Sequence, residues 1–576
     1  MKKLLVYLRP YRLQAILAPC FKLLEAAFEL LVPLIMADII DVGISSGDTA
    51  YILKKCLVLA GLGLCGFASA TCAQYFSAKA ATGATGRLRH ALFAHIQSLS
   101  YAELDRLGTA TLVTRMTSDM NQVQTGLNLT LRLLLRSPIV VFGAMIMAFT
   151  IDTKSALIFA VAIPALFAVV FAIMLSCIPL YRRVQTRLDG VTGAAQENLS
   201  GVRVIRAFTR EQTETASFEE KTASLFSAQQ FVGRLSALLN PLTYVIINLA
   251  IVAILRVGGV RVNEGAITQG QLIALYNYMS QILVELIKFA NLILNITKSA
   301  ACAGRISQVL DTKSSMVSGA DALPDGAGEA ELELRHVSFR YPQAGADALT
   351  DISFRAAPGE TIGIIGGTGS GKSTLANLIP RFYDASDGQV LVRGADVKTL
   401  QLQALRTRIG IVPQKALLFS GTIRENLRWG NADASDDALW DALRAAQADG
   451  VVQDKKGQLD AGVEPGGRNF SGGQRQRLTI ARALVRRPEL LILDDSASAL
   501  DFATDAALRK ALARLPWKPT VILISQRVSS IRHADKIVVL DDGRMAGLGT
   551  HAELKNTCPV YQEICRSQEK GEASAS

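Results

Sequence analysis

The chain has 576 residues, a length that is too great for one domain and predicts two to four. Half of the residues are hydrophobic and the mean hydropathy is +0.27. The apolar excess lies almost entirely before residue 300, so a membrane half is expected to precede an ordinary globular half. The net charge of +11 does not indicate nucleic-acid binding, because Arg and Lys gather where a membrane protein meets the cytoplasm. Eight cysteines without a CxxC pair or a Cys/His cluster exclude a disulfide framework and a Cys/His metal site.

The membrane half contains about six apolar stretches long enough to cross a bilayer. Their cores lie near residues 13–42, 55–82, 128–150, 155–181, 237–262 and 271–298. Some stretches carry charges, which are costly at bilayer depth unless they face a partner or a water-filled cavity. The candidates for lining a polar path are Glu25, Glu29, Arg132, Arg136, Arg256 and Glu285.

The charge of the loops predicts the topology of these spans. The N-terminus MKKLLVYLRPYR is basic and should stay inside the cell. Two polar, Arg-rich stretches, 83–126 and 182–236, keep a helical pattern and should extend the spans into the cytoplasm. The first apolar segment lacks a small-residue cleavage pattern, so it is not a cleavable signal peptide. The turns expected outside are 43–50, 152–154 and 263–269.

A change of composition marks the domain boundary. Residues 311–328 are rich in Ser, Gly, Asp and Ala without an apolar period, which predicts a linker. Short β-like runs alternate with helical ones from Ala330 onward, as is typical of an α/β domain. The expected fold is therefore multidomain: an all-α six-helix transmembrane domain over 1–310, followed by an α/β P-loop nucleotide-binding domain over 329–576.

The globular half contains a phosphate-loop pattern. TIGIIG at 361–366 is a short apolar strand, GGTGSGKS follows, and STLANLIPRFY reads as a helix. In this context the loop predicts binding of ATP with Mg²⁺, because its backbone N–H groups and the helix N-terminus cradle phosphate oxygens. Lys372 should reach the β- and γ-phosphates and the Ser373 hydroxyl should ligate Mg²⁺. The candidate binding residues are Gly366, Gly367, Thr368, Gly369, Ser370, Gly371, Lys372, Ser373 and Thr374.

The run LLILDD at 490–495 predicts a buried parallel strand that ends in carboxylates. Asp494 at the tip of the strand suits the Mg²⁺ shell. The next residue, Asp495, should be the general base that orients the attacking water.

In their order and spacing these motifs resemble an ATP-binding cassette (ABC) half-transporter of the exporter fold, over nearly the whole chain. Tyr341 in VSFRYP matches the aromatic residue that stacks on adenine in that family. Gln414 in IGIVPQ matches the glutamine that senses the γ-phosphate, joins the Mg²⁺ shell and contacts the membrane domain. The SGGQ signature, which binds the ATP held by the opposite subunit, and the SALD loop match at Ser471, Gly472, Gly473, Gln474 and Asp501.

The resemblance extends to the membrane half and to a membrane location. Residues 105–119 and 197–211 resemble the two intracellular loops that carry coupling helices, which we expect near 105–112 and 208–217. By analogy the chain is a multi-pass protein of a bacterial plasma (inner) membrane, with its N-terminus and nucleotide-binding domain in the cytoplasm.

The sequence departs from the family pattern at two positions, which carry Asp495 instead of Glu and Gln526 instead of His. Asp495 has one methylene less, and Gln526 can hydrogen-bond the γ-phosphate but cannot titrate. Both changes affect hydrolysis and leave ATP binding intact. They favour one subunit of a heterodimeric, multidrug-type exporter of lipophilic or amphiphilic compounds. This subunit would hold the degenerate ATP site and complete the site of a homologous partner through its own signature.

Other readings remain open. The fold also serves siderophore-type importers, and a homodimeric lipid or peptide exporter would retain the same motifs. A nucleotide-gated channel or regulatory subunit would bind ATP without pumping. The apolar segments argue against a soluble ATP-dependent regulator and predict contact with membrane lipids. The resemblance to a transporter implies a small-molecule substrate.

Overall fold

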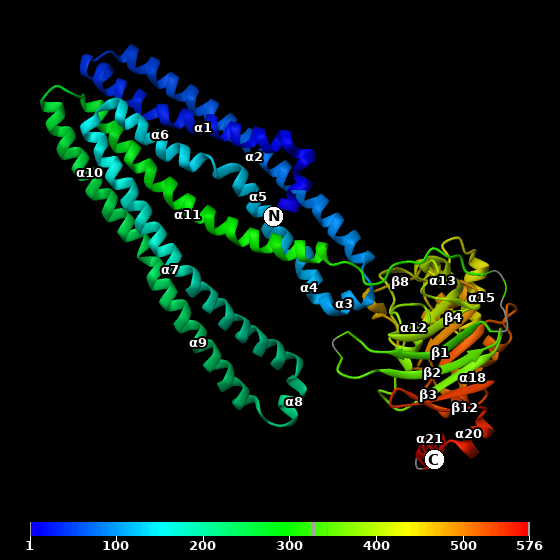
Figure 1. Ribbon diagram of the computed structural model, residues 1–576. Coiled ribbons are helices and arrows are strands. Elements are labelled where there is room, and N and C mark those ends of the chain that lie inside the picture. Colours follow the sequence, from blue (N-terminus) through cyan, green and yellow to red (C-terminus); the bar gives the residue numbers. More distant parts are fainter. Residues whose placement is uncertain (1, 325, 327–329, 343, 574–576) are drawn as a thin grey trace. The chain divides into compact units, whose positions relative to one another are not determined.

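The computed structural model describes residues 2–324, 326, 330–342 and 344–573 (Figure 1). The chain forms two compact units. We call them the membrane unit, Met1–Gln97 with Ala110–Thr312, and the nucleotide unit, Ser98–Thr109 with Lys313–Ser576. The fold class expected from the sequence, a helical domain followed by an α/β domain, is confirmed.

The membrane unit consists of long helices, several of which continue far beyond the length of an apolar span. Its elements are the 3₁₀ helix η1 (Lys2–Tyr11), α1 (Arg12–Asp38), the π-helical turn Ile39–Ile44, α2 (Thr49–Ser98), α4 (Thr109–Thr114), the π-helical turn Arg115–Asp119, α5 (Met120–Leu133), α6 (Arg136–Ile151), α7 (Thr153–Ser200), α8 (Val202–Ala207), α9 (Glu211–Ala237), α10 (Leu239–Asn263) and α11 (Gln269–Asp311). The six expected spans all fall on these helices.

Within the described residues, five helical segments are long and apolar enough to cross a membrane. They are Thr49–Ser98, Thr109–Ile151, Thr153–Ser200, Glu211–Asn263 and Gln269–Asp311. The first expected span, α1, is a helix of 27 residues that carries Lys22, Glu25 and Glu29 and is not among the five. The count of six spans therefore stays a prediction.

The three turns expected outside are held at one end of the membrane unit. Asp41, after α1, accepts a hydrogen bond of 2.7 Å from the Gly270 backbone at the start of α11. Asp152, between α6 and α7, pairs with Arg261 near the end of α10 at 3.0 Å. A side chain at position 270 would meet the Ala37 carbonyl at 2.4 Å, so only glycine permits this approach of α11 to α1.

The nucleotide unit contains two larger sheets and a two-stranded one. The antiparallel sheet has the order β2-β1-β4-β5, and the mainly parallel sheet has the order β12-β11-β3-β10-β9-β6. Strands β7 and β8 form the two-stranded sheet. The strands of the nucleotide unit are β1 (Leu332–Phe339), β2 (Leu349–Ala356), β3 (Thr361–Gly366), β4 (Asp387–Val392), β5 (Ala395–Asp396), β6 (Ile409–Val412), β7 (Gly421–Thr422), β8 (Gly462–Val463), β9 (Leu490–Asp494), β10 (Thr520–Ile524), β11 (Lys536–Asp541) and β12 (Arg544–Gly549). Strands β3 and β9 coincide with the two apolar runs identified in the sequence.

Helices pack around these sheets, and two apolar cores fill the unit. The helices are α3 (Tyr101–Leu107), α12 (Lys372–Leu378), α13 (Leu402–Arg408), α14 (Ile423–Arg428), α15 (Asp436–Ala445), α16 (Asp449–Gln453), α17 (Gly472–Val485), α18 (Phe502–Ala513), α19 (Val528–Ile531), α20 (His551–Thr557) and α21 (Pro559–Ala573). Strands β3, β9 and β10 are buried along almost their full length, as central parallel strands should be.

Two short helices, α3 and α8, lie just upstream of the ranges expected for the coupling helices. Helix α3 ends at Leu107 because Gly108 takes a φ of 75°, and α8 ends before the turn at Phe208. The ranges 105–112 and 208–217 were therefore wrong as helix bounds. Helix α3 belongs to the nucleotide unit, where the centre of the Tyr101 ring lies 4.6 Å from that of Phe382.

The expected linker is partly paired with the nucleotide unit. Helix α11 ends at Asp311, and residues 325, 327 and 328 of the linker, with residue 329 at the expected domain start, lie outside the described part. The Gly319 N–H donates to the Leu400 carbonyl at 3.1 Å, and the Asp321 N–H donates to Thr399 at 3.0 Å. A polar composition thus predicted a linker, but it did not reveal these backbone contacts.

Candidate functional site

The phosphate loop joins β3 to α12 and depends on glycine at defined points. Gly369 and Gly371 have φ values of +85° and +92°, a backbone region that L side chains rarely adopt. A side chain at Gly366 would meet the Leu540 carbonyl at 2.2 Å. The loop can therefore turn tightly from the strand into the helix N-terminus, which leaves its N–H groups for phosphate.

Lys372 lies over this loop. Its Nζ donates to the carbonyls of Gly366 at 2.9 Å and Gly367 at 2.5 Å. Burial lowers the pKa of Lys372, although Asp495 and Asp494 act in the opposite direction. Phosphate oxygens would give this ammonium group a stronger partner than the neutral carbonyls do.

Ser373 and Asp494 meet where a Mg²⁺ ion is expected. The Ser373 hydroxyl donates to Asp494 Oδ1 at 3.1 Å. Burial and the neighbouring Asp495 raise the pKa of Asp494, while Ser373 and Lys372 lower it. A hydroxyl, a carboxylate and the amide oxygen of Gln414 are hard oxygen donors, so these residues fit Mg²⁺ that takes its other ligands from phosphate and water.

The residue after Asp494 stands in an unusual backbone conformation. Asp495 has a φ of 46°, in the left-handed region where Asp is enriched among non-glycine residues. Its N–H donates to the Ile524 carbonyl at 2.9 Å, and Gln414 Nε2 donates to its carboxylate at 3.2 Å. Gln526 lies on the same cavity and is exposed. The two positions that depart from the family pattern thus border one site.

Tyr341, the residue predicted to stack on adenine, lines the cavity that contains Lys372. Its ring packs edge-on against Phe339 at 4.8 Å and Tyr383 at 5.4 Å. Its hydroxyl shares a hydrogen bond of 3.1 Å with Thr374 at the start of α12. The ring is therefore held at the edge of the phosphate-loop cavity.

A cavity of about 320 Å³ brings most of the predicted site residues together. Its predicted lining residues are Tyr341, Thr368, Gly369, Gly371, Lys372, Ser373, Thr374, Gln414, Asp494, Asp495 and Gln526. Ala348 and Ile524 also line the cavity, and no sequence pattern pointed to them, since an apolar residue in a strand or loop carries no motif. Gly366, Gly367 and Ser370 belong to the loop without lining the cavity.

The signature residues lie elsewhere in the nucleotide unit. Ser471 caps α17 through a capping box with Gln474, in which each side chain bonds the other's backbone N–H at 3.3 and 3.0 Å. Gly472 lines a second hollow together with Gln414 and Ala499. Among the described residues, none of the four signature residues lines the cavity around Lys372. The intact helix N-terminus offers unused backbone donors for an anion.

Asp501 has a local structural role. Its carboxylate accepts hydrogen bonds of 2.8 Å from the Thr504 backbone and hydroxyl, so it caps α18. The carbonyls of Ser498 and Leu500 in the same loop accept hydrogen bonds from Arg527. Asp501 does not line the cavity around Lys372. Its predicted contribution to nucleotide binding stays a prediction.

Four of the six candidate charges in the membrane unit form one ion network. Arg136 at the start of α6 bonds Glu285 of α11 at 2.5 Å and Glu29 of α1 at 2.6 Å, and it lies 4.0 Å from Glu25. Lys22 and Lys288 extend the network to Glu25 and Glu285. Buried charges therefore find partners, as the cost of charge at bilayer depth requires.

The remaining two candidate charges, Arg132 and Arg256, lie outside this ion network. The side chains of Arg132 and Arg256 are not part of the network that the described residues form. Glu29 and Lys288 remain 40% and 46% exposed, so the network reaches an open surface of the membrane unit through these two side chains.

Known proteins resemble the chain in both units. The family described as "ABC transporter transmembrane region" matches residues 15–286, and the family described as "ABC transporter" matches residues 349–498. An uncharacterized ABC transporter ATP-binding protein of Mycobacterium tuberculosis is 38% identical over 98% of this chain and 97% of its own. A protein of Mycobacterium bovis named "Fatty acid ABC transporter ATP-binding/permease protein" is 34% identical over 82% of this chain and 74% of its own.

A solved structure shares the fold over nearly the whole length. A bacterial Atm1-family ABC exporter with ATP bound superposes with a TM-score of 0.80, at 24% identity, and covers 97% of this chain and 98% of its own. Together with the nucleotide site, these likenesses identify an ATPase coupled to transport, in a multi-pass protein of the plasma (inner) membrane. With one helical membrane unit and one ATP-binding unit on a single chain, the protein belongs to the ABC transporter family as a half-transporter of the exporter fold.

Proposed function

We propose that this chain is the subunit of a heterodimeric ABC exporter that holds the weakly hydrolytic ATP site. The observation that carries the proposal is the pair Asp495 and Gln526 on the cavity around Lys372. The shorter carboxylate and the non-titrating amide both stand where hydrolysis is carried out, while the groups that hold ATP are complete. Losing a positioned general base lowers a rate by about 10²- to 10⁴-fold.

The position of Asp495 supports this reading. Its carboxylate accepts a hydrogen bond from Gln414 and its backbone is fixed to Ile524, so it has little freedom to move toward a lytic water. Displacing a catalytic group by about 1 Å can reduce a rate by about 10²-fold. A Glu at this position would extend one methylene further.

The signature supports the second half of the proposal. Ser471–Gln474 keeps its capping box and an open helix N-terminus, and none of these four described residues lines the cavity around Lys372. A homologous half-transporter would supply competent Walker residues to this surface. In a homodimer both composite sites would carry Asp495 and Gln526, whereas a heterodimer would confine the impairment to one site.

ATP binding would close the two nucleotide units, and hydrolysis at the competent site would reset them. Within this chain, Lys372 would hold the γ-phosphate, Ser373 and Asp494 would hold Mg²⁺, and Tyr341 would stack on adenine. Gln414 would sense the γ-phosphate, and α3 and α8 would serve as the coupling helices.

The proposed substrate is lipophilic or amphiphilic. Its polar part would meet Glu29 and Lys288, the exposed members of the ion network. The likeness to a protein named a fatty acid ABC transporter favours an amphiphile with a hydrocarbon chain. A homodimeric lipid exporter is the second candidate, since the same likeness is compatible with it.

The test is the ATPase activity of the purified chain alone and of the chain co-expressed with a candidate partner half-transporter. The co-expressed complex is also measured with the partner's catalytic Glu changed to Gln. We expect turnover only with the partner and its loss on the partner's substitution. Brisk hydrolysis by this chain alone would overturn the heterodimer proposal and leave the homodimer.

A further inference from the structure

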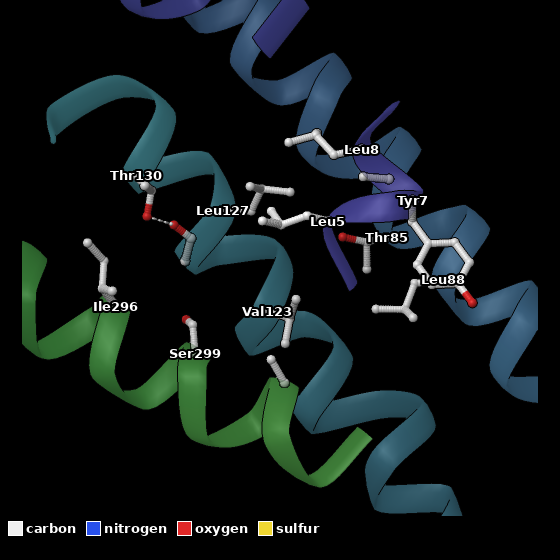
Figure 2. A pocket seen from close by; sticks show the side chains of 13 residues that line it. Leu5, Tyr7, Leu8, Thr85, Leu88, Val123, Leu127, Thr130, Ile296 and Ser299 are labelled. Carbon is white, nitrogen blue, oxygen red and sulfur yellow. Dashed lines mark hydrogen bonds between the residues drawn. The ribbon is translucent and has the colours of Figure 1, made fainter. Parts of the chain in front are cut away.

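The membrane unit contains an apolar cavity of about 160 Å³ that plays no part in the nucleotide site. It lies between η1 and the helices α2, α5 and α11, and Figure 2 shows apolar side chains converging on it from all four elements. The apolar side chains are those of Leu5, Leu8, Leu88, Val123, Leu127 and Ile296.

Three of the four hydroxyl groups on the lining residues are already engaged, and that of Tyr7 points away from the cavity in Figure 2. Thr85 donates to the Ala81 carbonyl at 2.7 Å, and Thr130 donates to the Gly126 carbonyl at 2.7 Å. Ser299 donates to the Gln122 carbonyl, also at 2.7 Å. Since these donors are satisfied within the protein, the cavity favours an apolar occupant. An apolar cavity of roughly 150 Å³ in another protein stays dry and binds benzene.

The N-terminal helix η1 lines one side of the cavity, and its Tyr11 side chain packs closely against Gly83 of α2. A side chain at Gly83 would lie 2.2 Å from Cζ of Tyr11, so only glycine lets the Tyr11 ring rest on α2. Leu5 and Leu8 line the cavity, while Arg9 and Arg12 are exposed. A helix with an apolar side and a basic side is suited to lie in a membrane interface.

We propose that this cavity holds the end of one acyl chain of an anionic phospholipid, with the headgroup phosphate against Arg9 and Arg12. Thr130 and Ile296 lie in the expected spans 128–150 and 271–298, and Ala84 shortly follows the expected span 55–82, so the cavity is expected at the cytoplasmic edge of the bilayer, within reach of lipid. Leu5 is 52% exposed, which leaves a side of the cavity open to a chain. Basic residues near a membrane surface attract anionic headgroups. The inference is independent of the transported compound and of the dimer.

A tryptophan reporter tests the proposal in the full-length protein. The native tryptophans Trp429, Trp440 and Trp517 all lie in the nucleotide unit, so a Trp placed in the membrane unit gives a separable signal. The reporter is Leu8→Trp at the cavity. The matched control is Leu57→Trp on α2, where the native side chain is 73% exposed. Both variants are placed in nanodiscs in which part of the phosphatidylglycerol carries bromine on its acyl chains, which quenches nearby Trp.

We expect the reporter to be quenched at a lower fraction of brominated lipid than the control, with a saturable curve. Brominated phosphatidylglycerol should be preferred over brominated phosphatidylcholine by about fivefold for each arginine. The double variant Arg9→Gln with Arg12→Gln should abolish that preference. Ala84→Leu, which narrows the cavity, should move the reporter's curve to that of the control, whereas Ala60→Leu on the exposed side of α2 should not.

Coinciding quenching curves for reporter and control would overturn the proposal. Preferential quenching by a brominated free fatty acid but by neither phospholipid would also overturn it, in favour of a fatty-acid site. Nucleotide binding by each variant is measured in the same samples and checks that the chain is folded. A second measurement, the phospholipid retained in native mass spectrometry, should fall for Ala84→Leu and not for Ala60→Leu.

Discussion

Asp494 and Lys372 lie in surroundings that oppose both of their charges. Burial raises the pKa of the Asp494 carboxyl and lowers the pKa of the Lys372 ammonium group. Both shifts mean that the site without nucleotide carries an electrostatic strain. Mg²⁺ and the phosphates of ATP supply charges of the opposite sign, so ligand binding should relieve this strain.

Replacing Asp494 by Asn should remove that strain and the Mg²⁺ site together. The nucleotide-free variant should unfold at a temperature equal to or above that of the unmodified chain. It should lose the stabilisation by Mg-ATP, which is about 2.7 kcal/mol at a ligand concentration of 100 Kd. Thermal unfolding with and without Mg-ATP measures both effects. A variant that is still stabilised to the full extent would remove Asp494 from the Mg²⁺ shell.

The Asp494→Asn substitution should also change how folding stability depends on pH. The folded-state pKa of Asp494 lies above its ordinary value, so the folded chain binds this proton more tightly than the unfolded chain does. That contribution to stability is full below the ordinary pKa and is lost as pH rises through the raised one. The variant should therefore gain stability relative to the unmodified chain as the pH rises above the ordinary Asp pKa of about 3.9.

Restoring the family's residues tests the impaired site directly. The change Asp495→Glu with Gln526→His should raise hydrolysis at this chain's site by about 10²-fold or more. The left-handed backbone at Asp495 is less favourable for Glu, so a loss of stability should accompany the gain. Single-turnover hydrolysis in the complex, with the partner's catalytic Glu blocked, measures this site alone. An unchanged rate would mean that the impairment has another cause.

Local motifs predicted the elements that bind nucleotide better than those that join distant helices. The glycines of the phosphate loop require a strand before them and a helix after them, so β3, the loop and α12 were evident from the sequence. The pairing of Arg136 with Glu285 spans 149 positions, and no local pattern reveals such a contact. The helix expected over 105–112 was wrong although Gly108 carried a local signal, because glycine with a positive φ commonly follows the last residue of a helix.

The ion network should stabilise the arrangement of α1, α6 and α11. Glu285→Ala would leave Arg136 without its 2.5 Å partner and Ser137 without its 3.0 Å acceptor. Because Glu29 and Glu25 stay near Arg136, the cost should be smaller than the about 3–5 kcal/mol that leaving a buried charge without a partner costs. Arg256→Gln, which removes a charge outside the network and within the expected span 237–262, should not lower the free energy of unfolding, because a charge at bilayer depth is costly. Unfolding of both variants in matched nanodiscs measures the difference, and equal losses would contradict the role of the network.

At the scale of the whole molecule, the sequence predicted two units but not their full boundary. The step in hydropathy and the polar linker located the change near residue 311. Contacts then assigned Ser98–Thr109 to the nucleotide unit, although this segment follows an apolar helix along the chain. Composition reports what a segment is made of, whereas assignment to a unit depends on contacts such as that of Tyr383 with Asp105 at 2.5 Å. Composition likewise does not reveal contacts with a partner subunit, so a partner is tested through the surface of this chain that would bind it.

The signature offers that test, because its N-cap serine has a structural counterpart elsewhere in the nucleotide unit. Ser471 caps α17 and Ser435 caps α15, each through its hydroxyl. Removing either cap should cost about 1 kcal/mol of stability. If α17 completes a site on a partner chain, Ser471→Ala should also lower the turnover of the complex while nucleotide binding at Lys372 persists, whereas Ser435→Ala should leave turnover unchanged. Steady-state hydrolysis and nucleotide binding by both variants separate these effects. Equal turnover in the two variants would reduce the signature serine to a helix cap and remove the basis for a site shared between chains.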